Sequence, residues 1–425
     1  MPIIRIEKIV YPGRSFGRVE GVVCLTDEGL PGELAEFEPL GVKPGLIEGR
    51  TVRIIEPSPR RVPPRCAHYR VCGSYQTAEI GLQIEIKRSQ WTEIFAPRRP
   101  AEAAAFEVVP SPLAWNYRTR TRFRVLWTPT GGNPAYNVSG SRTEYVPVDV
   151  CHLLAEPLQV LIKDALRAFR RPAPGLREIE ARLSLASGET LLVLHWSAPP
   201  NSRDFDPVMA DIAAGPRPVG IINVVKTRGN EREETGWGRD AIEEKIGGVV
   251  FGIGARSFFQ VNPSILPAVI EIMAEEIRRR RCRRLADIYC GLGLFGLALA
   301  TDVDRVFLVE SDPSNLRFLK ANIDRNGVSE STICDGPAEE WIGWVLDRGA
   351  DAVVLDPPRK GLAPAIVEEL KRRPVPLILY LACNPMTLAR DLGRLSPRYR
   401  TARLVGFDFF PQTPHLETLA VLEAL

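Results

Sequence analysis

Hydrophobic residues in the last third of the chain fall into short runs, each of which ends at a glycine or polar residue. The runs cover residues 285–289, 306–309, 352–355 and 377–381. Apolar residues at helical spacing stand between the runs and also before the first one, at 265–277. Short apolar runs that alternate with helical segments predict a parallel sheet covered by helices. We therefore expect an α/β C-terminal domain.

A glycine turn follows the first of these runs. Gly291, Gly293 and Gly296 stand before another helical segment, which is the strand–turn–helix opening of a doubly wound nucleotide fold. The next run ends in Glu310, whose carboxylate can accept hydrogen bonds from two ribose hydroxyls. The pattern suits NAD, FAD or S-adenosylmethionine, and its place late in a long chain disfavours a dehydrogenase.

Reactive side chains follow the later runs. Asp356 comes after the third run and Cys383 after the fourth, directly before a segment that predicts a helix. Ligands of open α/β sheets bind beyond the carboxyl ends of the strands, so these residues should meet the glycine turn in one crevice. A thiol near a helix start has its thiolate favoured. Glu417 precedes the last apolar stretch and is the favoured general base, with His415 as the alternative.

The C-terminal domain is expected to begin near a helix cap. Asn262 before Pro263 predicts a capped helix with a first-turn proline, and Gln260 just before it should point toward the glycine turn. The arginines at 278–281 close this helix, where they suit the negative end of the helix dipole.

Short strands separated by glycine and proline turns occupy the N-terminus. Segments 3–9, 17–25, 32–37 and 50–56 predict a small closed β-barrel of the OB type. A linker with three prolines at 59–65 ends it. We predict three domains: the barrel at 1–58, an α+β middle domain at 59–250 and the α/β domain at 251–425.

Alternating arginines mark the middle domain. Arg118, Arg120, Arg122 and Arg124 alternate without an acid, close to Tyr117 and other aromatic residues. On a strand these arginines would share one face, where guanidinium groups bind phosphates and aromatic rings stack on unpaired bases. The pattern favours RNA contact over a solvated strand edge.

Cysteine usage and composition limit the alternatives. Cys66 and Cys72, with Cys151 at a distance, are candidate ligands of a metal or iron–sulfur cluster, and two ordinary loop thiols are the alternative. The 425 residues carry a net charge of +3, too small to establish a polyanionic partner. Scattered cysteines, and the absence of a signal peptide or an apolar membrane span in the sequence, predict a cytoplasmic protein without membrane contact.

At the motifs of the C-terminal domain the sequence resembles the RNA 5-methyluridine methyltransferases, which methylate uracil C5 in transfer or ribosomal RNA. The shared motifs are Phe258-x-Gln260-x-Asn262, Tyr289-Cys-Gly, Asp356-Pro-Pro-Arg-x-Gly, Cys383-Asn-Pro-x-Thr, Arg390-Asp391 and Pro411-Gln-Thr-x-His-x-Glu417. The resemblance implies an RNA-binding TRAM barrel, a central RNA-binding domain and a Rossmann-like class I methyltransferase domain.

The resemblance also implies a role for each site residue. Cys383 would be the nucleophile that attacks uracil C6, and Glu417 the base that removes the C5 proton. Asp356 would hold the uracil edge, and Tyr117, Arg118, Arg120 and Arg122 would contact RNA. The residues implied to bind S-adenosylmethionine are Gln260, Tyr289, Gly291, Gly293, Glu310, Asp335 and Asp356.

Two positions depart from the family pattern. Some members bind a [4Fe–4S] cluster through Cys-x5-Cys-Gly-x-Cys plus a distant cysteine, and here Tyr75 replaces the third cysteine, so a four-thiolate cluster is doubtful. Leu294 stands where many members have a polar residue, and it receives no binding role.

Several functional readings remain open from the sequence. An NAD-dependent oxidoreductase would leave Asp356, Cys383 and Glu417 without a role. An amino-group methyltransferase needs an aromatic residue after Asp-Pro-Pro, where this chain has Arg359. A catalytically silent RNA-binding protein is the third alternative. The barrel favours 23S ribosomal RNA over transfer RNA as the substrate, and we expect a monomer without an obligate protein partner.

Overall fold

The computed structural model describes residues 1–98, 106–138, 141, 143–215, 218–227 and 230–425. Its N-terminal segment forms a closed barrel. Its strands, in the order β1-β2-β3-β5-β4, are β1 (Ile3–Val10), β2 (Arg14–Val19), β3 (Val22–Thr26), β4 (Leu34–Lys43) and β5 (Leu46–Glu56). The single strand expected at 17–25 is wrong, because Glu20 and Gly21 both adopt positive φ and turn the chain between β2 and β3.

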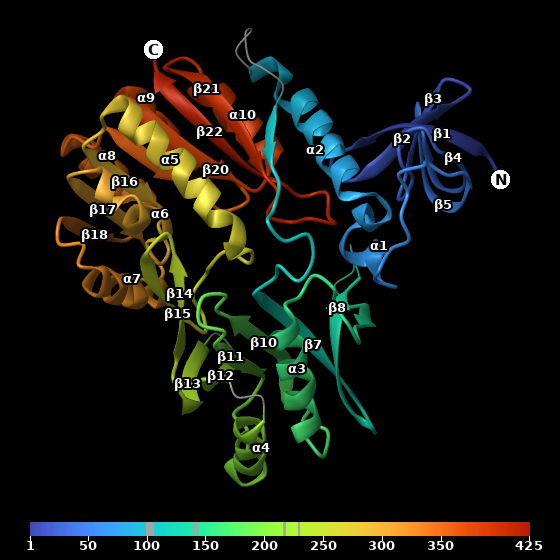
Figure 1. Ribbon diagram of the computed structural model, residues 1–425, viewed down its shortest axis with the longest axis horizontal. Helices are drawn as coiled ribbons and strands as arrows, with labels where there is room; N and C mark the ends of the chain where they lie inside the picture. The colour runs from blue at the N-terminus through green and yellow to red at the C-terminus, as the bar shows by residue number, and fades with distance from the viewer. Residues whose placement is uncertain (99–105, 139–140, 142, 216–217, 228–229) are drawn as a thin grey trace.

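A long helix connects the barrel to the C-terminal sheet (Figure 1). After the short α1 (Tyr69–Cys72) and the 3-10 turn Ser74–Thr77, α2 (Ile80–Phe95) is followed by a second 3-10 turn, Ala96–Arg98. The sequence pattern does not predict α2, because Gln83, Lys87 and Gln90 interrupt its buried face. Each of these polar side chains has a partner outside the helix, which makes their burial tolerable.

The middle of the chain forms a seven-stranded sheet with helices and a separate hairpin. The sheet, ordered β13-β12-β11-β10-β7-β8-β9, consists of β7 (Arg120–Thr128), β8 (Gly131–Asn137), β9 (Tyr145–Pro147), β10 (Leu176–Leu183), β11 (Thr190–Trp196), β12 (Gly220–Thr227) and β13 (Asn230–Gly238). The helices are α3 (Glu156–Ala168) and α4 (Ser202–Ala214), and the hairpin is β14 (Ala241–Ile246) with β15 (Val249–Gly254). Strands β10 and β11 form an antiparallel hairpin with Ser187 and Gly188 in its turn.

The C-terminal domain has a mixed sheet, ordered β18-β17-β16-β19-β20-β22-β21-β6, in which β16 to β20 run parallel as expected. Its strands are β6 (Glu107–Val109), β16 (Arg284–Ile288), β17 (Arg305–Glu310), β18 (Ser331–Asp335), β19 (Ala352–Leu355), β20 (Leu377–Ala382), β21 (Tyr399–Phe407) and β22 (Glu417–Ala424). The first five in chain order after β6 run parallel, and β22 is antiparallel to β20 and β21. The strand β6 lies within the range predicted for the middle domain, before the seven-stranded sheet in sequence, and pairs parallel to β21.

Helices cover both faces of this sheet. They are α5 (Leu266–Arg280), α6 (Leu294–Ala298), α7 (Pro313–Asn326), α8 (Ala338–Asp347), α9 (Pro364–Arg372) and α10 (Pro385–Leu395). Residues of α5, α6 and α7 form one hydrophobic core with one face, and residues of α2, α8, α9 and α10 form a second core with the other. This layering leaves the carboxyl ends of β16, β17, β19 and β20 along one edge.

The start of the helical segment before β16 differs from the expected cap. A 3-10 turn, Pro263–Ile265, begins after Asn262, but the Asn262 side chain makes no capping bond and instead donates to Ser111 Oγ and the Phe409 carbonyl oxygen. The arginines at the end of α5 have the structural role expected of them, since Arg278, Arg279 and Arg280 pair with acidic side chains.

Candidate active site at the carboxyl edge of the eight-stranded sheet

The glycine turn after β16 opens toward empty space at one position only. A side chain at Gly291 would meet no atom within 4 Å, whereas one at Gly293 would lie 2.8 Å from Leu319 and one at Gly296 would lie 2.4 Å from Leu308. Gly293 and Gly296 therefore permit helix packing, and Gly291 is the glycine that leaves room for a ligand. Tyr289, directly before the turn, adopts a φ of 68° that is costly for a non-glycine residue and typical of functional turns.

Glu310 is held rigidly beside this turn. Its Oε2 accepts from the Gly291 N–H at 2.9 Å, and its Oε1 accepts from the Ser311 and Asp312 N–H groups at 2.6 and 2.7 Å. The carboxylate keeps further lone pairs for a ligand. Asp335 is its register partner on β18 and is exposed at the same edge.

Asp356 and Gln260 face each other across the crevice. The Gln260 Nε2 donates to Asp356 Oδ2 at 3.4 Å, which joins the segment before α5 to the end of β19. Burial raises the pKa of Asp356 to about 7, against the opposing hydrogen bond from Gln260. A carboxyl with such a pKa can exist in either protonation state at neutral pH, as a site for a polar ligand often requires.

Cys383 and Glu417 are brought together by the ladder between β20 and β22. Ala382 pairs with Thr418, so Cys383 comes directly after this pair and Glu417 directly before it. Burial, followed by the Glu417 carboxylate, raises the pKa of Cys383 to about 11. Burial, followed by Asp356, raises the pKa of Glu417 to about 8. The substrate-free site thus favours a neutral thiol and a protonated acid near pH 7.

Arg359 is a site residue to which the sequence reasoning assigned no role. It follows Asp356 in the loop after β19, and its guanidinium charge opposes the rise in the pKa of both Cys383 and Glu417. The same charge, after burial, helps to lower the pKa of His415 to about 4. The signal for Arg359 in the sequence was only its place in the Asp356 motif.

Two polar atoms beside the turn have no protein partner. Asp287 Oδ1 and Asn315 Oδ1 are buried and make no hydrogen bond within the described residues. Asp287 Oδ2 accepts from the Gly296 N–H at 2.8 Å, and Asn315 Nδ2 donates to Glu310. Unsatisfied buried acceptors next to an open glycine turn are what a hydrogen-bonding ligand would complete.

The arginine–aromatic segment is only partly available at the surface. Tyr117 is fully buried and donates to the Pro411 carbonyl oxygen at 3.2 Å, and Arg118 has a buried Nε without a partner in the described residues. Arg120 pairs with Glu180, and Arg122 pairs with Glu178 on the adjacent strand β10. Tyr117 and Arg118 therefore contact protein in this structure, and Arg122 is the exposed member of the set.

The structure brings the three candidate metal ligands near one another. Burial, followed by the thiols of Cys151 and Cys66, raises the pKa of Cys72 to about 11. Tyr75, at the position of the missing cysteine, is buried and donates to Gln90 Oε1 at 3.2 Å. No set of three His, Cys, Asp or Glu side chains within the described ranges is arranged to hold a metal ion. These residues do not fit a four-thiolate cluster.

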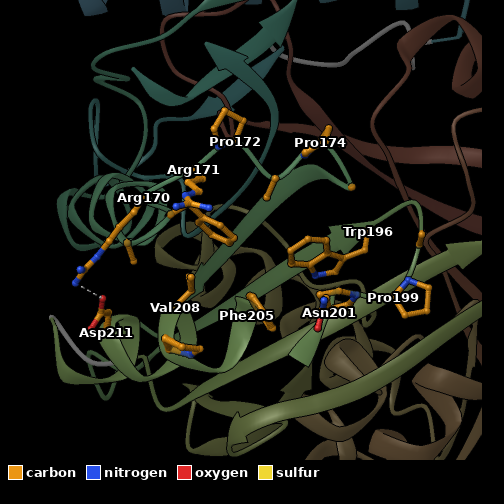
Figure 2. Close-up of a pocket in the computed structure, with 17 residues that line it drawn as sticks. Arg170, Arg171, Pro172, Pro174, Trp196, Pro199, Asn201, Phe205, Val208 and Asp211 are labelled. Carbon is orange, nitrogen blue, oxygen red and sulfur yellow. Dashed lines mark hydrogen bonds and ion pairs between the residues drawn. The ribbon is translucent and has the colours of Figure 1, made fainter. Parts of the chain in front are cut away.

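A cavity of about 650 Å³ lies elsewhere, in the middle domain (Figure 2). Phe169, Trp196, Phe205 and several prolines line it, and Arg170 pairs with Asp211 at its rim. None of the predicted site residues borders this cavity, so it is separate from the crevice at the sheet edge. In the described part of the chain, every helix is too short or too polar to cross a membrane.

Comparisons with known proteins agree with the site. Residues 247–425 match the family described as tRNA (Uracil-5-)-methyltransferase. An uncharacterized RNA methyltransferase of Thermosynechococcus vestitus is 28% identical, with 99% of this chain and 97% of the relative aligned. One from Listeria innocua is 27% identical over 99% of this chain and 97% of its own length.

A solved structure has the same fold over the whole chain. The Pyrococcus abyssi tRNA (uracil-54, C5)-methyltransferase in complex with S-adenosyl-L-homocysteine is 24% identical and has a TM-score of 0.75, with 99% of this chain and 100% of that chain covered. The expected combination of a small barrel, a mixed middle domain and a class I methyltransferase domain is thereby confirmed.

Proposed function

We propose that this chain, a member through residues 247–425 of the tRNA (uracil-5-)-methyltransferase family, methylates C5 of one uridine in structured RNA through a covalent bond between Cys383 and C6 of the base. The observation that carries the proposal is the meeting of Cys383, Glu417 and Asp356 beside the turn at Gly291. An NAD-dependent oxidoreductase would leave those three side chains without a role.

S-adenosylmethionine is the methyl donor in this proposal, and it supplies an electrophilic sulfonium methyl group when bound. The open side of Gly291 and the fixed carboxylate of Glu310 suit the ribose, with Asp335 near the adjoining end of β18. In this proposal Gln260, Tyr289 and Asp356 contact the amino-acid part of the cofactor; the hydrogen bond from Gln260 to Asp356 and the positive φ of Tyr289 beside the glycine turn support this assignment. The structural relative with S-adenosyl-L-homocysteine supports this choice of cofactor.

Cys383 acts as the nucleophile because uracil C5 alone attacks a methyl group poorly. The thiol gives its proton to solvent, its sulfur bonds to C6, and the electron pair of the C5–C6 double bond moves toward C5 and O4 as an enolate. Arg359 favours this step, since its positive charge stabilises the thiolate. Asp356 is placed to bind the N3–H and O4 edge and to orient the ring.

Glu417 completes the reaction as the general base. After C5 has gained the methyl group, the Glu417 carboxylate removes the C5 proton, the C5–C6 double bond re-forms and the Cys383 sulfur leaves. Glu417 must be ionised to accept that proton, and its pKa is raised to about 8, so the fraction of enzyme with an active base increases as the pH rises toward 8. The target base must be unpaired or flipped out to reach both groups.

We propose 23S ribosomal RNA as the substrate, on the basis of the N-terminal barrel. Transfer RNA is the second candidate, because the archaeal relative of similar fold acts on tRNA uracil-54 and covers the barrel as well. Unmodified transcripts of both RNAs, incubated with the enzyme and methyl-labelled S-adenosylmethionine, test the choice. Mass spectrometry of digested product should show 5-methyluridine at one position in one RNA, and label in neither RNA would contradict the proposed function.

A further inference from the structure

A hollow at the junction of the barrel, α2 and α10 adjoins the candidate active site. It has a volume of about 400 Å³, within the range of about 300–1,000 Å³ typical of small-ligand pockets. Tyr11 and Pro12 from the barrel, Glu93 and Ile94 from α2, and Met386 from the first turn of α10 line it. The pocket therefore combines the N-terminal and C-terminal parts of the chain.

Tyr11 connects this pocket with the reacting groups. Its ring lies edge-on to Trp91 at a centroid distance of 5.4 Å, and the Trp91 indole donates to Thr418 Oγ1 at 2.6 Å, next to Glu417. The Tyr11 hydroxyl lies within electrostatic range of Arg359, Cys383 and Glu417. A barrel side chain thus reaches the crevice in which the C-terminal domain holds its thiol and carboxyl groups.

The polarity and charge of the lining residues indicate which kind of ligand this pocket can bind. Met386 is 57% exposed and presents an apolar surface only three residues after Cys383. The Gln90 amide is already used, since its Nε2 donates to the Ile9 carbonyl oxygen. Glu93, the charged residue of the lining, is paired with Lys8 at 2.8 Å, so the lining offers no lysine or arginine to a phosphate. A flat, uncharged ring with a polar edge fits this pocket, and a phosphate group does not.

We propose that this pocket binds the nucleobase next to the target uridine, with Tyr11 as the residue that positions it. The inference rests on the proposed function, because an unpaired nucleotide beside an extruded uridine is the ring that would enter a pocket adjoining Cys383. Tyr11 binds through its ring and hydroxyl, and Pro12 and Met386 supply apolar contact. The barrel then contributes to substrate recognition within the active site itself.

Steady-state kinetics on short hairpins test the subsite. The RNA is the shortest hairpin that the wild-type enzyme methylates, prepared intact and with one abasic nucleotide on either side of the target. Base stacking on aromatic residues is worth about 1–3 kcal/mol, so we expect Tyr11→Ala to raise KM for the intact hairpin roughly tenfold, with kcat changed by less than about twofold. The abasic hairpin should raise the wild-type KM by a similar factor.

The decisive result is whether the two losses add. If Tyr11 binds that base, Tyr11→Ala should cause almost no further loss on the abasic hairpin. Tyr11→Phe separates the hydroxyl from the ring, Met386→Ala tests the opposite wall, and Leu40→Ala, an exposed barrel residue, should leave kinetics unchanged. If Tyr11→Ala does not fold, Met386→Ala must show the same non-additivity.

Two other outcomes overturn the inference in distinguishable ways. Fully additive losses, or an unchanged KM in both Tyr11→Ala and Met386→Ala, would show that the pocket does not bind the neighbouring base while the enzyme remains an RNA methyltransferase. Absence of methylation of any RNA by the wild-type enzyme would remove the proposed function and this subsite with it.

Discussion

Cys383 and Glu417 adjoin the same register pair of antiparallel strands, Cys383 after Ala382 on β20 and Glu417 before Thr418 on β22. The backbone ladder, not a flexible loop, thereby brings a thiol and a carboxyl group together. The Trp91 indole on α2 donates a hydrogen bond to Thr418 Oγ1, the residue after Glu417. The spacing of the two reacting groups should consequently be insensitive to changes elsewhere in the loops.

Cys383 should be trapped by RNA that contains 5-fluorouridine. With fluorine at C5 there is no proton there for the base to remove, so the bond between sulfur and C6 persists after methyl transfer. We expect a denaturation-resistant complex on gels with wild-type protein and S-adenosylmethionine, and none with Cys383→Ala. Cys282→Ala, which removes a buried thiol at the end of α5, is the matched control and should still form the complex. A complex that survives Cys383→Ala would exclude this nucleophile.

Glu417→Gln should stop the reaction after methyl transfer. Without a carboxylate the C5 proton stays in place and Cys383 cannot leave, so ordinary RNA should accumulate as a methylated covalent complex. Loss of a general base typically costs about 10²–10⁴ in rate. Single-turnover assays that follow label on protein and on free RNA separately measure this. Rapid release of methylated RNA by Glu417→Gln would assign proton removal to another group.

Arg359→Gln should make Cys383 less reactive at a given pH. The arginine charge opposes the upward shift in the pKa of Cys383, so its removal raises that pKa further. Arg359 is exposed, so solvent screening should keep this further rise in the pKa of Cys383 small. The rate of Cys383 alkylation by iodoacetamide, followed by peptide mass spectrometry against pH, should move to higher pH. Lys360→Gln is the neighbouring control, and an equal shift there would argue for a general charge effect.

Glu417→Gln should also change how stability depends on pH. The pKa of Glu417 is 4.5 for the free side chain and about 8 in the folded protein, so between these values the folded state holds a proton that the unfolded state has lost. The stabilising contribution is complete below pH 4.5 and is lost as the pH rises toward 8. At about 1.4 kcal/mol per pKa unit, the free energy of unfolding of Glu417→Gln relative to wild type should be on the order of 2–4 kcal/mol higher near pH 8 than near pH 4.5.

Denaturant unfolding at the two ends of that range measures the effect of Glu417→Gln. Glu38→Gln, at a half-exposed barrel position paired with Arg50, serves as the control because such an ion pair should contribute little to stability at either pH. The same difference between the two pH values in wild type and Glu417→Gln would show that Glu417 does not carry the proton.

Lys87→Met should destabilise the junction between α2 and the C-terminal sheet. Lys87 Nζ and Asp408 Oδ1 lie 2.6 Å apart, and both side chains are buried. Removal of one partner leaves an uncompensated charge, which typically costs about 3–5 kcal/mol. Thermal unfolding should show the loss, and the double variant Lys87→Met with Asp408→Asn should recover most of it. A double variant as unstable as the single one would point to lost packing instead.

Much of the C-terminal fold follows from its hydrophobic pattern. Buried parallel strands are apolar throughout, so the four runs that end near Tyr289, Glu310, Asp356 and Cys383 are visible in the sequence and are confirmed as strands. Their common edge follows from parallel pairing alone. Gln260 and Glu417 are indicated by their places before a predicted helix and before the last apolar stretch, and the shared family motifs support both.

The contributions of the N-terminal half could not be predicted in the same way. Helix α2 buries Gln83, Lys87 and Gln90, although polar residues at these positions predict a surface helix. The partners that make their burial possible lie more than 300 residues away in the sequence for Gln83 and Lys87. Tyr11 is a single aromatic residue in a barrel turn, without a periodic signal. Long-range pairing of this kind is a property of tertiary structure.

The short strand β6 has a consequence for how the protein is made. Glu107–Val109 leaves the ribosome before the strands of the seven-stranded sheet, yet its partner β21 is at Tyr399–Phe407, close to the end of synthesis. The nascent chain must keep this edge strand unpaired while almost 300 further residues are added. Assembly of the catalytic sheet is therefore a nearly post-translational event, and slow translation or early release should favour misfolded chains over an active fragment.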